Sequence, residues 1–159
     1  MSHKTLSKLL LIAGAIACIG GAAVFFLYAP ALSIECSLIY PELAWLSWPM
    51  LVYVWLIALM YIHAVFFYMR ISLRLGKNLS FCVKNADDLR RIALFLVIAA
   101  GLWFLLIFLP GAVNVDIGPA FLLFLLASLA TLAVAMVAYV LSLLVRRAAE
   151  LQAENDLTI

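Results

Sequence analysis

Four long stretches of almost uninterrupted hydrophobic residues alternate with short polar stretches along the chain. They cover residues 9–29, 49–69, 92–109 and 119–145. A helix that crosses a bilayer needs roughly 20 predominantly apolar residues, and each stretch approaches or exceeds that length. None shows the alternation of a half-buried strand or the single apolar stripe of a helix on a soluble protein. The pattern predicts an all-α polytopic membrane protein with four transmembrane helices in one bundle, forming a single domain over residues 1–159.

Prolines and arginines mark the ends of the four stretches. Pro30 follows the first stretch, and Pro49 is suited to the first turn of the second helix. Arg90-Arg91 precede the third stretch and Pro110-Gly111 follow it, while Arg146-Arg147 follow the fourth. We therefore expect the helices to begin and end at these residues.

The first stretch follows a short basic segment, as the apolar core of a secretory signal peptide does. Such a core is typically about 7–15 residues long, and residues 9–29 exceed it. We interpret the stretch as a retained first helix.

The composition excludes a soluble domain. Hydrophobic residues make up 69% of the chain and charged residues 11%, whereas soluble domains are roughly half apolar and a quarter charged. The partner that this composition implies is the lipid bilayer.

The basic residues indicate the orientation of the helices. All ten lie in the N-terminal segment, in a loop over residues 70–91 or in a tail over residues 146–159, whereas residues 30–48 and 110–118 carry three acidic residues and no base. Basic residues accumulate in short cytoplasmic segments. We therefore expect a multi-pass membrane protein with its N- and C-termini in the cytoplasm.

The four stretches contain no Asp, Glu, Lys or Arg, and His63 is the only histidine in them. A proton relay would need a second ionisable group at depth, so we interpret His63 as a neutral histidine hydrogen-bonded to another helix. The alternative is a small transporter or channel subunit with a polar site at His63.

Motifs of enzymatic or metal chemistry are lacking as well. The sequence holds no Ser/His/Asp, phosphate-loop or metal-ligand pattern, and its three cysteines lack ligand spacing. We therefore predict no catalytic residues, no metal and no cofactor, and a protein that is not an enzyme.

Small residues at four-residue spacing mark faces where helices can approach closely, since close packing drives helix association in lipid. The faces are Ala13, Ala17 and Gly21, beside Gly14, Cys18 and Ala22, in the first helix and Ala127, Thr131 and Ala135 in the fourth. We expect them to pack inside the bundle. The alternative is a homo-oligomer, or an assembly protein, that uses the same faces.

The predicted cytoplasmic segments have helical features of their own. Asn85 is placed to cap a helix with Asp87 and Asp88 in its first turn, so the third helix can begin below the membrane. The tail keeps helical periodicity after Arg147 and should extend the fourth helix.

The tail ELQAENDLTI, residues 150–159, resembles the terminal signature of the bacterial membrane family catalogued as domain of unknown function 2975. Phe81, Asn85 and the run Leu89-Arg90-Arg91-Ile92 resemble its cytoplasmic loop, and Tyr40-Pro41-Glu42 resembles its outer loop. The family is uncharacterised, so the resemblance implies no catalytic residues. Its members are often encoded beside a small helix-turn-helix regulator. The resemblance therefore implies a protein of the bacterial inner membrane that tethers or inhibits a DNA-binding protein, without binding nucleic acid itself.

We predict that such a partner contacts the loop and the tail. The expected contact residues are Phe81, Asn85, Arg90, Arg91, Glu150, Glu154, Asp156, Leu157 and Ile159. The competing interpretation is a solvated loop that sets the orientation and whose arginines meet anionic lipid headgroups.

Overall fold

The computed structural model describes residues 3–77, 82–108 and 120–156, and these are almost entirely helical. The elements in order are α1 (His3–Ala23), the π-helical turn η1 (Val24–Tyr28), α2 (Ala29–Ile39), the 3-10 turn η2 (Pro41–Leu43), α3 (Ala44–Leu75), α4 (Val83–Leu105) and α5 (Ala120–Asp156). Within the described residues there is no strand, as the apolar pattern predicts.

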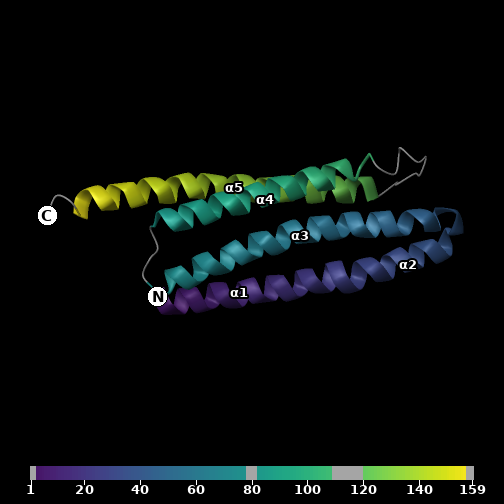
Figure 1. Ribbon diagram of the computed structural model, residues 1–159, viewed down its shortest axis with the longest axis horizontal. Helices are drawn as coiled ribbons and strands as arrows, with labels where there is room; N and C mark the ends of the chain where they lie inside the picture. Colours follow the sequence, from purple (N-terminus) through teal and green to yellow (C-terminus); the bar gives the residue numbers. More distant parts are fainter. Residues whose placement is uncertain (1–2, 78–81, 109–119, 157–159) are drawn as a thin grey trace.

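These elements form four long rods that lie side by side (Figure 1). The first rod is α1, η1 and α2 end to end, and it packs against α3. α3 packs against α4, and α4 packs most extensively against α5. Over the described residues, α1 contacts neither α4 nor α5, so the bundle is open on the side of α1.

The core lies where α3, α4 and α5 meet. Its buried residues are Ala64, Phe67, Ile92, Ala93, Leu96, Ala135 and Ala138. Four of these seven are alanines, which let the helices approach closely where lipid provides no hydrophobic drive between them.

Three of the rods are long and apolar enough to cross a membrane, by length and composition. They are Thr5–Ile39, Pro41–Leu75 and Phe121–Asn155. The remaining predicted span, the third at 92–109, coincides with α4 from Ile92 to Leu105, which is about 21 Å at 1.5 Å per residue. The first two and a half turns of α4 are rich in charged residues. Such apolar helices are consistent with a membrane protein.

The expectation that Pro30 ends the first helix is wrong, because the chain stays helical as far as Ile39. Proline lacks an N–H and its ring clashes with the carbonyl one turn earlier. The π-helical turn Val24–Tyr28 widens the backbone just before it, and the Ala29 N–H donates to the Val24 carbonyl, five residues back. In this register the Phe25 carbonyl faces the nitrogen of Pro30, which has no hydrogen. Trp55 on α3 supplies the missing donor, its Nε1 lying 3.1 Å from the Phe25 carbonyl oxygen.

The second predicted helix, 49–69, is longer at both ends. α3 begins at Ala44 and includes Pro49 in its second turn, where the proline removes one hydrogen bond and is exposed. It continues to Leu75, because Arg70 and Arg74 are good helix formers whose side chains reach a carboxylate on α4.

Much of the predicted loop 70–91 is therefore helical. α4 begins at Val83, below the apolar stretch as expected, but Cys82 rather than Asn85 precedes its first turn. Asn85 is instead the third residue of α4 and is buried, because its side chain contacts α3.

The last helix, predicted over 119–145, extends as α5 from Ala120 to Asp156, so the tail prolongs it as predicted. Leu109 and Pro119, at the predicted ends of the third and fourth helices, lie outside the described residues.

The small-residue faces differ in their outcome. On α5, Thr131 and Ala135 are buried, as expected. On α1, Ala13, Ala17, Cys18 and Ala22 are exposed and no atom lies within 4 Å of a Cβ built at Gly21, so the expectation is wrong for these residues. Gly14, from the same predicted set, is buried against Tyr68 and Met69 of α3. The face of α1 that packs is therefore the one that carries Ser7 and Gly14.

Candidate functional site

Charged residues gather at the end of the molecule where α1 begins, α3 ends, α4 begins and α5 runs on toward the C-terminus (Figure 1). We call this end the charged rim. It holds ion pairs between α3 and α4 and between α4 and α5.

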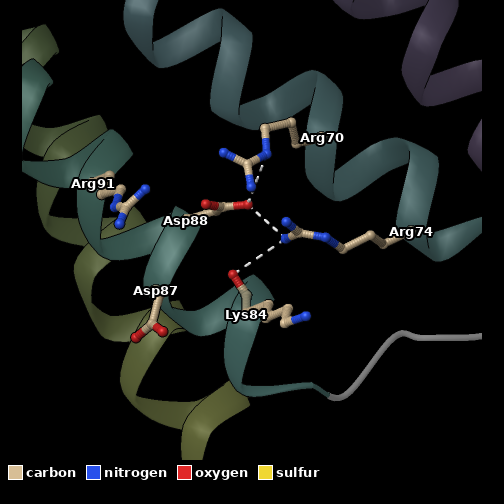
Figure 2. Close-up of a pocket in the computed structure, with 6 residues that line it drawn as sticks. All are labelled: Arg70, Arg74, Lys84, Asp87, Asp88 and Arg91. Atoms are coloured by element: carbon tan, nitrogen blue, oxygen red, sulfur yellow. Dashed lines mark hydrogen bonds and ion pairs between the residues drawn. The ribbon is translucent and has the colours of Figure 1, made fainter.

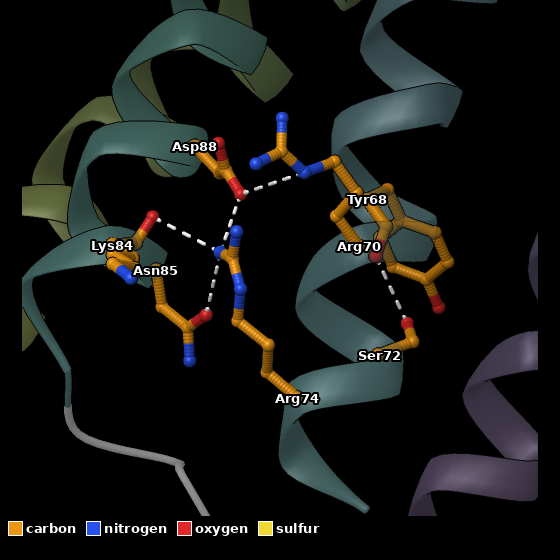
Figure 3. Close-up of polar contacts among 7 residues, drawn as sticks. All are labelled: Tyr68, Arg70, Ser72, Arg74, Lys84, Asn85 and Asp88. Carbon is orange, nitrogen blue, oxygen red and sulfur yellow. Dashed lines mark hydrogen bonds and ion pairs between the residues drawn. The ribbon is translucent and has the colours of Figure 1, made fainter.

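Arg74 on α3 is the centre of the first set of contacts. Its Nη1 lies 2.5 Å from Asp88 Oδ2, 3.2 Å from Asn85 Oδ1 and 3.2 Å from the Lys84 carbonyl oxygen. The side chain of Asp88 is only 4% exposed and that of Arg74 is 19% exposed. One guanidinium therefore reaches two successive turns of α4 (Figure 3).

Arg70, one turn earlier on α3, shares the same carboxylate. Its Nε lies 3.7 Å from Asp88 Oδ2. Its guanidinium also lies over the rings of Phe66 and Phe67, with Cζ 5.8 and 5.7 Å from their centroids. Arg91 on α4 lies over Phe67 as well, at 5.3 Å. Such contacts are favourable cation–π geometry, and they hold two arginines from different helices near one ring.

An open cleft of about 320 Å³ lies among these residues (Figure 2). It is lined by four cationic and two acidic side chains: Arg70, Arg74, Lys84, Arg91, Asp87 and Asp88. In Figure 2, Asp88 points toward the arginines of α3 and Asp87 points away from them, toward α5.

Asp87 makes the contact with α5. Its Oδ1 lies 3.7 Å from Arg146 Nη2, with both side chains about half exposed. An exposed pair of this kind contributes little to stability. It does mark where α5 passes the rim before it continues to Asp156.

The start of α1 reaches the end of α3 at the same end of the molecule. Ser7 Oγ donates to the Ser72 carbonyl oxygen at 2.7 Å, and Ser72 Oγ donates back to the Tyr68 carbonyl oxygen at 3.0 Å (Figure 3). A Cβ at Gly76 would lie 2.8 Å from Ser7 Oγ, so the glycine permits this close approach.

The predicted contact residues differ in how accessible they are in the structure. Arg90, Arg91, Glu150 and Glu154 are exposed near the rim or on the extension of α5. Asn85 is 2% exposed, so its side chain is a structural contact of Arg74 rather than part of an accessible surface. Asp156 is the last residue of α5, and Phe81, Leu157 and Ile159 lie outside the described residues.

From the sequence we did not predict that the residues lining the cleft lie together. A signal was present, because Arg70 and Arg74 are four residues apart, and Lys84, Asp88 and Arg91 follow at spacings of four and three. Residues at these spacings share one face of a helix. Two such faces on successive helices indicate a charged contact between them.

His63 is hydrogen-bonded, but not to another helix as expected. Its Nδ1 lies 2.8 Å from the Leu59 carbonyl oxygen of its own helix. The carbonyl can only accept, so this nitrogen carries the proton. The ring stacks on Phe95 of α4, with centroids 5.0 Å apart and planes at 25°. The hydrogen bond within α3 and the stacking on Phe95 give His63 a structural role.

The chemical capacity of the rim follows from its groups. Guanidinium and ammonium groups around a partly enclosed space bind oxyanions. Within residues 3–77, 82–108 and 120–156, no group of three or more His, Cys, Asp or Glu side chains could hold a metal ion. The cationic side chains around the cleft suit the rim to ionic contacts with a ligand or a protein.

Comparison with known proteins agrees with the resemblance that the loop and tail carry. No curated protein and no solved structure matches the chain. A family model described as "Protein of unknown function (DUF2975)" matches residues 31–159, which include α3, α4, α5 and the whole charged rim except the start of α1. Since this match covers most of the chain, the protein belongs to the DUF2975 family.

Proposed function

We propose that this protein is a non-enzymatic, multi-pass protein of the bacterial inner membrane that holds a small helix-turn-helix DNA-binding regulator at its cytoplasmic face. The observation that carries the proposal is the gathering of charged helix ends at one rim, beside an α5 that extends beyond α4 (Figure 1). The class of partner rests on the family resemblance.

Four membrane crossings are supported by the path of the chain. α3 ends and α4 begins at the charged rim, whereas α4 ends and α5 begins at the opposite end (Figure 1). A bilayer that α3 and α5 cross is therefore crossed by α4 too. The short apolar part of α4 is covered by its neighbours on one side, where Ile92, Leu96 and Ala99 are buried, and its exposed side is apolar, with Leu94, Val97 and Ile98.

The orientation is supported by both ends of the rods. All ten basic residues belong to the rim or to the segments that adjoin it, which favours a cytoplasmic rim by the positive-inside rule. Trp45 and Trp48, near the opposite end, are 61% and 70% exposed. Exposed tryptophans of this kind suit the outer membrane–water interface.

The surface offered to a protein partner carries both signs of charge. Arg90 and Arg91 are exposed on α4, and Glu150 and Glu154 are exposed on the extension of α5. Charged rims of this kind steer a partner and fix its register more than they add affinity. The aliphatic residue Leu151, 63% exposed on the same extension, supplies an apolar contact.

The test is co-purification from membranes. The full chain, carrying a tag, is expressed with the regulator encoded beside it, and the amount of regulator that co-purifies is measured. Removal of residues 148–159, or the pair Glu150→Gln and Glu154→Gln, should reduce it strongly. The matched control is Glu35→Gln with Glu42→Gln, at the opposite end, which removes the same charge without adding a base to that segment and should leave it unchanged. No association of the unmodified chain, or association insensitive to the tail, would refute the proposal.

A transporter or channel subunit is the alternative function. Its basis is His63, whose ring bonds its own helix and stacks on Phe95. These contacts give the alternative no added support. A second copy of the chain remains a candidate partner for α1, whose exposed face is open to lipid or to another protomer.

A further inference from the structure

The cleft of the charged rim has an excess of positive charge that its own carboxylates do not balance. Arg70, Arg74, Lys84 and Arg91 face Asp87 and Asp88 around it. Asp87 lines the cleft, but its carboxylate pairs with Arg146 of α5, which does not line it. Asp88 alone is left facing the arginines, and Arg74 and Arg70 already share its Oδ2.

Two cations of the cleft are therefore available to a ligand. In the part of the chain that the structure describes, no carboxylate lies within ion-pair distance of Lys84 or Arg91. Arg91 is held over Phe67 at 5.3 Å, and Arg70 over the same ring at 5.7 Å. The ring thus holds two like charges near each other, an arrangement that a bound anion would stabilise.

The volume of the cleft and the N-terminus of α4 also favour a small anionic ligand. A volume of about 320 Å³ lies at the lower end of the size of ligand sites. Lys84 is the second residue of α4, and Cys82 provides no side-chain cap for that helix. The positive end of the helix dipole therefore adds to the field of the side chains.

The geometry points to a binding site for a phosphate group in this cleft, with Lys84 and Arg91 as its principal ligands and Arg70 beside them. Guanidinium groups and an ammonium group match the oxygens of phosphate. The group can come from the headgroup of an anionic phospholipid or from free phosphate. Phe66, directly below Arg70 and 56% exposed, offers apolar surface next to the cleft, as a lipid would require. This inference does not depend on the regulator proposed above.

The experiment uses the full-length protein, freed of lipid in an uncharged detergent. Native mass spectrometry measures the binding of phosphatidylglycerol and of phosphatidylcholine, and the melting temperature is recorded with and without each lipid. Phosphatidylglycerol should bind and stabilise the protein more than phosphatidylcholine. The pair Lys84→Gln with Arg91→Gln should weaken that binding about thirtyfold, as expected from losing two cations that each contribute about 1 kcal/mol to the attraction of an anionic headgroup.

The matched control is Lys77→Gln with Arg90→Gln, which removes the same charge from neighbouring exposed positions outside the cleft. It should bind phosphatidylglycerol as the unmodified chain does. The melting temperatures without lipid show whether each variant is folded. Equal weakening in both pairs, or equal binding of the two lipids by the unmodified chain, would overturn the inference.

A competition experiment separates the two sources of the phosphate group. Inorganic phosphate is added in excess to the complex with phosphatidylglycerol. Displacement of the lipid supports a site that accepts free phosphate. Retention of the lipid, together with its loss in the Lys84/Arg91 pair, supports a site for the lipid headgroup.

Discussion

Arg74 and Asp88 join the end of α3 to the start of α4 through an ion pair of 2.5 Å, in which only 4% of the aspartate side chain is exposed. A buried pair of this kind is weak evidence for net stabilisation, but removing one partner leaves the other without a counter-charge. The relationship therefore fixes how the two helices sit at the rim. It also determines which cations of the cleft are left for other ligands.

The first prediction concerns this pair. Asp88→Asn should destabilise the protein by about 2–3 kcal/mol, because Arg74 loses its carboxylate while it remains mostly buried. The measurement is the free energy of unfolding in mixed micelles with increasing sodium dodecyl sulfate, followed by circular dichroism. Asp87→Asn is the control: its side chain is 50% exposed, so its effect should stay below about 1 kcal/mol. Equal effects of the two substitutions would show that the buried pair has no special role.

The second prediction tests the packing of α1 on α3. A Cβ at Gly14 would lie 2.9 Å from Tyr68 Cε1 and 3.2 Å from Met69 Sδ. Tyr68 cannot move away freely, because its hydroxyl donates to the Leu10 carbonyl oxygen at 3.1 Å. Gly14→Ala should therefore lower the melting temperature.

Gly21→Ala is the matched control in the same helix, since no atom lies within 4 Å of its Cβ position. Alanine is favoured over glycine inside a helix by up to about 1 kcal/mol. The melting temperature should therefore stay constant or rise. A higher melting temperature for Gly14→Ala would mean that α1 does not pack on Tyr68 in solution.

The number and path of the helices could largely be predicted from the sequence, because each long apolar run forms one rod. The extension of α5 could be predicted too, since helical periodicity continues past Arg147 to Asp156. The ends of the other helices depend on tertiary contacts. The sequence pattern assigns Arg70 and Arg74 to a loop, whereas in the structure they lie on α3 because both contact Asp88 of α4.

The site was predictable only in part. The accumulation of charge in loop and tail located the rim, but the sequence does not reveal which bases have a carboxylate partner. The spacing of Arg146 and Glu150, for example, favours a pair along one helix, whereas Arg146 contacts Asp87 of α4. Pairing of this kind depends on which helices are neighbours. The sequence pattern does not specify that.

The third prediction concerns a chain of hydrogen bonds between α3, α4 and α5. Trp103 Nε1 donates to the Tyr61 hydroxyl at 3.2 Å, and the Tyr61 and Thr131 oxygens lie 2.6 Å apart. Thr131 Oγ1 donates in turn to the Ala127 carbonyl oxygen at 2.7 Å, so Tyr61 must donate to Thr131. Tyr61→Phe should cost about 1 kcal/mol of unfolding free energy, within the range of hydrogen bonds between helices in membranes.

A double-mutant cycle isolates this contact. In a Thr131→Val background, Tyr61→Phe should cost less, because the acceptor is already absent. Tyr28→Phe, at a position that is 61% exposed, serves as the control and should have little effect. Strictly additive effects of Tyr61→Phe and Thr131→Val would contradict a direct hydrogen bond.

The last prediction tests how the chain passes Pro30 without ending its helix. The Phe25 carbonyl lacks a helical donor because Pro30 has no N–H, and Trp55 Nε1 takes that place at 3.1 Å. Trp55→Phe should therefore destabilise the protein by about 1 kcal/mol. The control is Trp48→Phe, at a position that is 70% exposed, which should change little.

The substitution Pro30→Ala restores a backbone N–H at this position, so in that background Trp55→Phe should cost less. The measurement is again the free energy of unfolding in mixed micelles, taken for both single variants and for the double variant. If Trp55→Phe costs the same in the unmodified chain and in the Pro30→Ala background, the indole does not replace the donor that proline removes. In that case α1 and α2 must continue through this turn for another reason.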